Sequence, residues 1–435
     1  MANGTNVDSV LDQDLIARLI GRARGEEPVI SLYLQAWGNQ SERRAVLKNL
    51  VREGEAAIED DPGWDAERRK HAKGLLERAK TRAEELLATA PTQQGRGAVA
   101  IFAMPEGLEY LRVPVDLRDR IVVDRSPYAS PLSSLIDQYE RYGVIICDQK
   151  KARLFDVYLG QLQDWEELEH EKERHRHFPA GGPARHGGSA PAGKTNAPGG
   201  PGAKSAGGAK PGFGAGGYQG LEELRRRNHA EYVLHLHLQS VADRAFRRFR
   251  LRPYDRLILA GTKEVLSPLE EHLHSYLKQR VVAKEVLPID IAQKDAREKV
   301  LAIEAKVEEQ KEHELLTQIQ NSMGTSQLGV AGIDQTLRAL FFGQVRTLVV
   351  LDDDARPGRE CPECHFLFPH PESAKETSPT LIECPVCKRP TRRVPDVVDE
   401  AVELAILSGS QVEHVAYAKS ELQKLGGMAA LLRFK

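Results

Sequence analysis

The feature that most constrains the fold is a run of 48 residues, 174–221, that contains neither Asp nor Glu. Fifteen glycines fall between Ala180 and Gly220, and Lys204 and Lys210 are among the few charged residues. A segment of this composition cannot bury enough apolar surface to offset the entropy it would lose on ordering. We therefore predict a long Gly-rich loop, residues 178–220, between two folded regions.

Length and charge narrow the possible classes of protein. The 435 residues correspond to roughly three domains of ordinary size. A formal net charge of −2 excludes a uniformly basic coat for nucleic acid, so contact with phosphate requires local patches of Lys and Arg. No apolar run approaches the roughly 18 residues of a membrane helix, and residues 1–14 do not resemble a secretory signal. We expect a cytoplasmic protein with no membrane partner.

Strand and helix patterns alternate along the chain, which predicts an α/β fold. We predict three mixed α/β domains. The N-terminal domain, 1–140, contains a helical hairpin, and the middle domain, 141–285, carries the long loop. The C-terminal domain, 286–435, contains an insert, 356–393, that bears cysteines. The expected elements are strands at 29–34, 99–103, 109–115, 143–147, 152–159, 255–261, 345–351 and 411–417, and helices at 41–59, 65–88, 221–250, 267–279, 291–321 and 396–407.

Four of the five cysteines have the spacing of a zinc site. Cys361, Cys364, Cys384 and Cys387 form a C-x₂-C-x₁₉-C-x₂-C pattern. Each pair makes a tight turn, and together the pairs supply the four thiolates of a tetrahedral Zn²⁺ shell. Because all four ligands come from the protein, we predict one closed, structural zinc ion that replaces the core a short insert cannot build.

Other readings of the cysteines are weaker. Residues 361–365 form a C-x-x-C-H string, which can mark haem attachment, but the second cysteine pair argues against haem. His365 is a possible but unneeded zinc ligand. Cys147 stands alone at a predicted strand end and is interpreted as a small core residue.

Basic residues follow the loop directly, at Arg225, Arg226 and Arg227. A glycine-rich segment that leads into a basic helix forms a flexible cationic finger, which suits a channel lined with phosphate. The alternative is a simple flexible linker. No P-loop, G-x-S-x-G or strand-linked G-x-G-x-x-G motif is present.

Several short segments in a fixed order carry a resemblance to a known family. They are residues 25–32, 145–155, 257–261, 332–340 and 426–434, together with the zinc-type insert. In this order the chain resembles the archaeal and eukaryotic class-I peptide-chain release factors and their Pelota relatives. More specifically, it is similar to bacterial hibernation or rescue factors of that superfamily.

The resemblance implies binding in the ribosomal A site. In this family, a Gly-Gly-Gln loop of the middle domain reaches the peptidyl-transferase centre. The C-terminal domain would bind a translational GTPase such as elongation factor Tu. The segment Gly216-Gly217-Tyr218-Gln219 resembles Gly-Gly-Gln with a Tyr inserted. Gln219 is thus the candidate catalytic residue, although one extra residue displaces it by up to about 3.5 Å. Tyr218 could instead stack on an RNA base.

The family's stop-codon motif, Asn-Ile-Lys-Ser, is missing. The tip of the predicted helical hairpin carries Glu59-Asp60-Asp61, which repels phosphate. Stop-codon reading is therefore not expected.

Three functions remain in competition. The first is a factor that occupies the A site of idle or stalled ribosomes without decoding, contacts rRNA and possibly P-site tRNA, and is not an enzyme. The second promotes hydrolysis of the peptidyl-tRNA ester, as a release factor does. The third is a zinc-stabilised adaptor with no ribosomal role. No DNA partner is expected. The predicted RNA-binding residues are Lys204, Lys210, Gly216, Gly217, Tyr218, Gln219, Arg225, Arg226 and Arg227.

Overall fold

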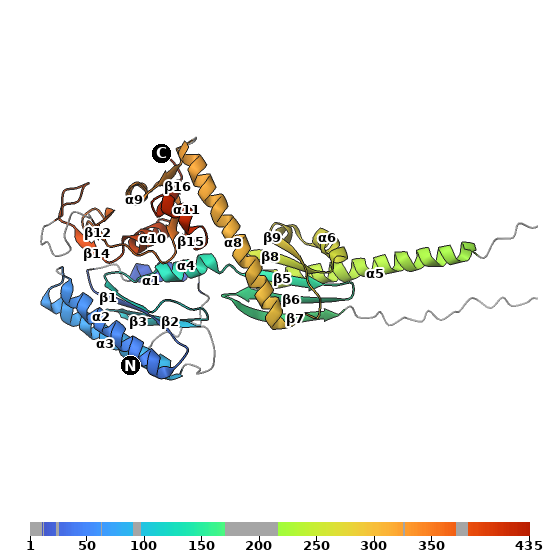
Figure 1. Ribbon diagram of the computed structural model, residues 1–435, viewed down its shortest axis with the longest axis horizontal. Coiled ribbons are helices and arrows are strands. Elements are labelled where there is room, and N and C mark those ends of the chain that lie inside the picture. Colours follow the sequence, from blue (N-terminus) through green and yellow to red (C-terminus); the bar gives the residue numbers. More distant parts are fainter. Residues whose placement is uncertain are drawn as a thin grey trace, which may run out of the picture.

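The structure is a computed structural model that describes residues 11, 13–22, 26–61, 63–89, 97–169, 216–324, 327–370 and 382–435, without the side chains of residues 164 and 216–227. Most of the predicted loop, including Lys204 and Lys210, lies outside the described residues. Within them the strands form four sheets, and helices cover or connect the sheets (Figure 1).

The first sheet has the strand order β3-β2-β1-β4, with β1 (Val29–Gln35) at its centre. Ile30, Leu32 and Leu34 point to one face, and Tyr33 points to the other, because side chains alternate along a strand. The first face packs on α2 (Gln40–Asp60) and α3 (Ala66–Thr89), and the opposite face packs on α1 (Gln13–Arg22) and α4 (Ser130–Gln138). The other strands are β2 (Ala98–Met104), β3 (Gly107–Val113) and β4 (Arg120–Asp124).

The second sheet has the order β7-β6-β5-β8-β9, in which β5 and β8 run parallel. Gly261 ends β8 at φ +141°, and a Cβ there would lie 1.8 Å from the carbonyl oxygen of Cys147, so the position requires glycine. The elements are β5 (Tyr142–Cys147), β6 (Lys151–Tyr158), β7 (Gln161–Glu169), α5 (Gly216–Leu251), β8 (Arg256–Gly261), α6 (Lys263–His272), α7 (Ser275–Lys278) and β9 (Val281–Val286).

Helix α5 has two parts. Leu238, Val241, Ala242 and Ala245 in its C-terminal part are buried against the second sheet. Its N-terminal part runs past the sheet and away from the rest of the molecule (Figure 1). The helix therefore projects the Gly216–Gln219 segment from the body of the protein.

Helix α8 (Gln293–Gly324) runs from the second sheet to the third (Figure 1). The third sheet has the order β10-β16-β11-β15, and a small sheet, β13-β12-β14, forms the cysteine-bearing insert. The remaining elements are β10 (Gly329–Ala331), α9 (Ile333–Phe341), β11 (Val345–Leu351), β12 (Gly358–Glu360), β13 (Leu367–Pro369), β14 (Arg392–Val394), α10 (Val397–Leu407), β15 (Gln411–Val415), α11 (Lys419–Lys424) and β16 (Met428–Leu432).

The predicted mixed α/β class is confirmed, and several boundaries are corrected. The helix predicted at 267–279 is instead two helices, α6 and α7, and α6 begins before Pro268 and contains it. The predicted loop 178–220 is too long at its C-terminal end, because α5 starts at Gly216 rather than at 221. The prediction weighted the low helix propensity of Gly216, Gly217 and Gly220 too heavily.

Several elements were missed, namely the helices α1, α4 and α11 and the strands β4, β7, β9, β10, β12, β13 and β14. Among the described residues, no helix is both long and apolar enough to cross a bilayer.

Candidate functional site

The four cysteines of the insert converge on one point. The Sγ atoms of Cys361 and Cys387 are 3.4 Å apart, and those of Cys364 and Cys384 are 3.6 Å apart. All four Sγ atoms lie within 4.8 Å of one another. These separations far exceed the roughly 2.05 Å of a disulfide bond, so the cysteines are free thiols.

Two similar backbone turns position these thiols. The amide of His365 donates to the carbonyl of Cys361 at 2.8 Å, and the amide of Lys388 donates to that of Cys384 at 3.0 Å. Both donors have positive φ, 59° and 61°, which lets each chain reverse directly after its second cysteine. The amide of Val386 also donates to the Cys384 sulfur at 3.4 Å. Each C-x-x-C pair therefore aims two sulfur atoms at the same point.

The donor set fits a tetrahedral metal ion. Four sulfurs at about 2.3 Å from a central Zn²⁺ would be about 3.8 Å from one another, close to the spacing observed here. His365 is not a member of this cluster of converging groups, and its Nδ1 contacts Glu360 Oε1 at 2.9 Å. The predicted convergence of Cys361, Cys364, Cys384 and Cys387 is confirmed, and the cluster could hold a metal ion.

The Gly216–Gln219 segment forms the first turn of α5, and Arg225, Arg226 and Arg227 follow within the same helix. The helix places all seven residues on one projecting rod (Figure 1). We use the term arm for residues 216–232 of this rod. The roles predicted for these residues stay predictions.

The base of α5 is attached to the second sheet by ion pairs. Arg248 Nε lies 3.0 Å from Oδ1 of the buried Asp156, and Arg244 lies 2.6 Å from Oε1 of Glu166. Arg247 and Arg250 point to solvent on the same stretch. The sequence alone did not distinguish arginines that anchor the helix from arginines that remain exposed.

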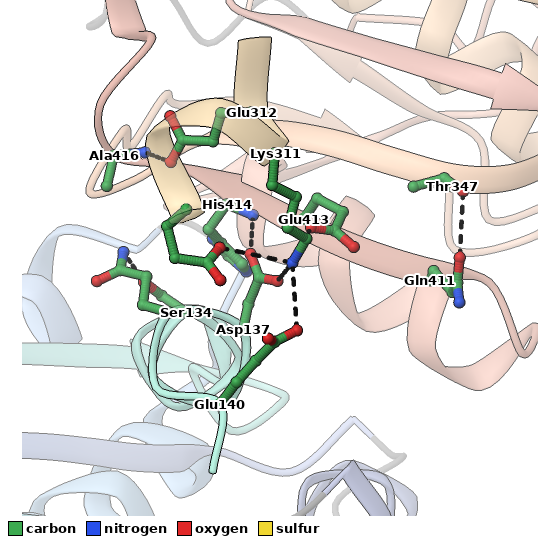
Figure 2. A network of polar contacts seen from close by, with 12 residues as sticks. Ser134, Asp137, Glu140, Lys311, Glu312, Thr347, Gln411, Glu413, His414 and Ala416 are labelled. Carbon is green, nitrogen blue, oxygen red and sulfur yellow. Dashed lines mark hydrogen bonds and ion pairs between the residues drawn. The ribbon is translucent and has the colours of Figure 1, made fainter. Parts of the chain in front are cut away.

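A second polar cluster, the Lys311 junction, joins distant segments of the chain (Figure 2). The Nζ atom of Lys311 on α8 lies 3.0 Å from Glu413 Oε2 on β15 and 3.4 Å from Asp137 Oδ1 on α4. Glu308 and Glu140 approach the same ammonium group at 3.6 and 3.7 Å. Lys311 thus faces four carboxylates, of which that of Glu140 also pairs with Arg256 at 2.5 Å.

Burial and mutual repulsion shift the pKa values at this junction. Burial raises the pKa of Glu304 to about 8, with the charges of Glu308 and Glu140 adding to it. Burial likewise raises the pKa of Glu308 and of Glu413 to about 7. Burial alone would lower the pKa of Lys311, but Asp137 and Glu413 raise it above its ordinary value.

Neighbouring contacts make the junction continuous. The carboxylate of Glu312 accepts hydrogen bonds from the amides of Ala416, Tyr417 and Ala418 at 2.7–2.9 Å. The amide of His414 donates to Asp137 Oδ2 at 2.5 Å. These bonds connect α4, α8 and the end of β15 (Figure 2). No sequence motif pointed to this junction, because its members are far apart in the chain.

The tip of the α2–α3 hairpin is partly neutralised. Glu59 pairs with Lys73, and Asp61 Oδ1 accepts from the amide of Gly63 at 2.7 Å. Trp64 is buried beside Arg125, whose guanidinium carbon lies 5.8 Å from its ring centroid. Asp60 remains exposed. The tip therefore keeps the exposed carboxylate of Asp60 beside charges that are partly compensated.

Comparison with known proteins identifies the middle of the chain. Residues 127–309 match the sequence model of the bacterial archaeo-eukaryotic release factor family 10. This segment runs from before α4 into α8, and includes the second sheet and the arm. The relationship to archaeo-eukaryotic release factors, predicted from the sequence, is confirmed for this segment, which is less than half of the chain. The first sheet and the four cysteines lie outside the matched segment.

Solved structures also match. The archaeal translation termination factor aRF1 is 18% identical, with 97% of this chain and 98% of that chain covered and a TM-score of 0.23. Pelota from Archaeoglobus fulgidus is 11% identical, with 78% and 80% covered and a TM-score of 0.29. A model of ribosome-bound archaeal Pelota and ABCE1 is 11% identical, with 98% and 95% covered and a TM-score of 0.37. No curated protein gives a match.

Proposed function

We propose that this protein is a translation factor that occupies the A site of idle or stalled ribosomes without reading a stop codon. The single observation that carries the proposal is the placement of the arm. Within the segment that matches a release factor family, α5 projects Gly216–Gln219 and Arg225–Arg227 away from the body of the protein. The arm would reach toward the peptidyl-transferase centre, and its arginines would bind rRNA phosphate.

The remaining parts of the proposal assign roles to the other regions. We propose that the domains are residues 1–140, 141–285 and 286–435, and that the cysteine cluster holds one structural Zn²⁺. The zinc would hold the insert together and take no part in chemistry, since all four ligand positions are thiolates. A translational GTPase such as elongation factor Tu is proposed as a partner. The exposed carboxylate of Asp60 supports the absence of stop-codon reading, because it would repel mRNA phosphate.

Cosedimentation with vacant 70S ribosomes tests the proposal. The full chain should pellet with ribosomes at low salt, and binding should weaken as salt rises, because counterions compete for phosphate. Replacing Arg225, Arg226 and Arg227 together with Ala should weaken binding and flatten the salt dependence. The matched control replaces three exposed cations of α2, Arg44, Lys48 and Arg52, and should bind as the wild type does. Failure of the wild-type chain to bind at low salt would leave only the zinc-stabilised adaptor.

The alternative function is peptide release through the altered Gly-Gly-Gln segment. The observation that favours it is that Gln219 lies at the projecting end of α5, where a release factor needs a glutamine. Release of a labelled peptide from stalled complexes, abolished by Gln219→Ala, would establish this function. Equal release with and without that change would exclude it, and we expect no stimulated release because the inserted Tyr218 displaces Gln219.

A further inference from the structure

A stack of aromatic rings lies at the C-terminal end of α5, at the opposite end of that helix from the arm. The ring centroids of Phe246 and His274 are 4.1 Å apart with an interplanar angle of 15°, and those of His274 and Tyr276 are 5.3 Å apart with an angle of 4°. Three nearly parallel rings thus come from two elements, α5 and the start of α7. We call these three residues the ring stack.

The outer members of the ring stack face solvent. Tyr276 is 57% exposed, although large aromatic side chains usually bury most of their surface, and His274 is exposed as well. Phe246 is half-buried and continues into Phe249, whose ring centroid lies 6.4 Å from it. The stack therefore begins at the edge of the core and ends in an open aromatic face.

The backbone that carries the exposed ring of Tyr276 is held in place from several sides. The amide of Tyr276 donates to His274 Nδ1 at 3.3 Å, and its carbonyl accepts from Arg280 at 2.8 Å. Its neighbour Leu277 is fully buried and anchors α7 in the core. A ring whose backbone is fixed in this way loses little conformational entropy when a ligand stacks on it.

Positive charge surrounds the ring stack. The stretch from Arg244 to Arg252, at the end of α5, contains five arginines, of which Arg244 and Arg248 pair with carboxylates of the second sheet. Exposed Arg250 lies one turn after Phe246 on the same side of the helix. The guanidinium carbon of Arg280 lies 4.9 Å from the Phe249 centroid, and Lys278 is exposed on α7. Proteins bind single-stranded nucleic acid with two features: exposed flat rings, on which the unpaired bases stack, and nearby cations, which attract the phosphates.

We propose that the ring stack is a platform on which an unpaired base of single-stranded RNA stacks against Tyr276 or His274, with Arg250, Lys278 and Arg280 facing the backbone phosphates. The choice of RNA as the ligand rests on the proposed function, whereas the argument that a flat ligand stacks on these rings rests on the geometry alone. This platform would be separate from the arm and would give the protein a second RNA contact, at the other end of α5.

The test uses the full chain and a short single-stranded RNA of adenosine and 4-thiouridine, without ribosomes. Fluorescence anisotropy measures affinity, and photo-crosslinking followed by mass spectrometry identifies the contact. We expect a crosslink in the peptide containing Tyr276. Tyr276→Ala should weaken binding roughly 5- to 150-fold, the range for the loss of one base stack, and Tyr276→Phe should nearly restore it.

Two comparisons keep the result interpretable. Tyr417→Ala removes another tyrosine of similar exposure, 52%, in the C-terminal region, and should leave RNA binding unchanged. A thermal melt shows whether Tyr276→Ala still folds. The proposal is overturned if Tyr276→Ala binds RNA like the wild type with an unchanged crosslink pattern, in which case the ring stack is an anchor for a protein partner. Ribosome cosedimentation is measured separately, so either proposal can fail while the other stands.

Discussion

Two polar centres of this protein, the cysteine cluster and the Lys311 junction, differ in kind. The cysteine cluster gathers four similar ligands from residues 361 to 387, through two near-identical turns. The Lys311 junction brings together groups as far apart as Asp137 and His414, with Lys311 facing several acids, one of which, Glu140, also pairs with Arg256. The first is a local centre that would depend on a metal ion. The second is a long-range centre that depends on the folded arrangement of α4, α8 and β15.

This difference predicts different sensitivities. A metal centre responds to chelation and to loss of a thiol, and its effects stay within the insert. A buried centre with more carboxylates than cations responds to pH and to loss of a cation. The loss of stability then spreads to all the elements that the centre joins. The three predictions below test this contrast, beginning with the largest expected effect.

Replacing Cys384 with Ser should abolish metal binding and unfold the insert. Zinc binding in small zinc domains contributes about 10–16 kcal/mol, so residues 358–394 should lose their structure without the metal. Metal analysis by mass spectrometry should find one zinc per wild-type chain and none in the variant, and limited proteolysis should cut within the insert. His365→Ala is the matched control and should retain the metal. Full zinc content in Cys384→Ser would contradict the assignment.

Replacing Lys311 with Met should destabilise the folded protein by about 2–3 kcal/mol at pH 8. Removal of the cation leaves the buried carboxylates without a compensating charge, which usually costs about 3–5 kcal/mol of stability. The loss should be smaller here because the Lys311 side chain is 26% exposed. Urea denaturation gives the free energy of unfolding. The loss should be smaller at pH 6, where protonation of Glu308 and Glu413 relieves the repulsion. Lys306→Met on the exposed side of α8 should have little effect, and equal losses in both variants would argue against the junction.

Replacing Glu304 with Gln should stabilise the protein at pH 8 by about 1–2 kcal/mol and have little effect near pH 5. The pKa of Glu304 is about 8 in the folded protein, above its ordinary value of 4.5, so the folded state holds its proton longer than the unfolded state does. Wild-type stability should therefore fall as the pH rises from about 4.5 to 8, and the glutamine variant should fall less.

The measurement is the urea midpoint across this pH range. Glu309→Gln, at an exposed position on the same helix, is the control and should leave the wild-type slope unchanged. A slope that is the same in wild type and Glu304→Gln would show that Glu304 ionises freely in the folded state.

The same contrast explains what the sequence could predict. The cysteine spacing is a local pattern with one chemical meaning, so the cluster was predicted residue by residue. The strand at 345–351 and the helical hairpin follow from local apolar periodicity and helix propensity, and were also found. The Lys311 junction could not be predicted, because Lys311 and Glu413 look like ordinary surface charges until the fold buries them. Local propensity also misplaced the start of α5, since glycines that favour loops continue that helix.

The central claim is that this chain binds the ribosome and extends its arm toward the peptidyl-transferase centre. A cryo-EM map of the full chain on vacant 70S ribosomes tests it most directly. We predict density for the protein in the A site, with α5 directed at the peptidyl-transferase centre and Gln219 near the position of the tRNA end. A map with no density in the A site, or with α5 pointing away from the peptidyl-transferase centre, would contradict it.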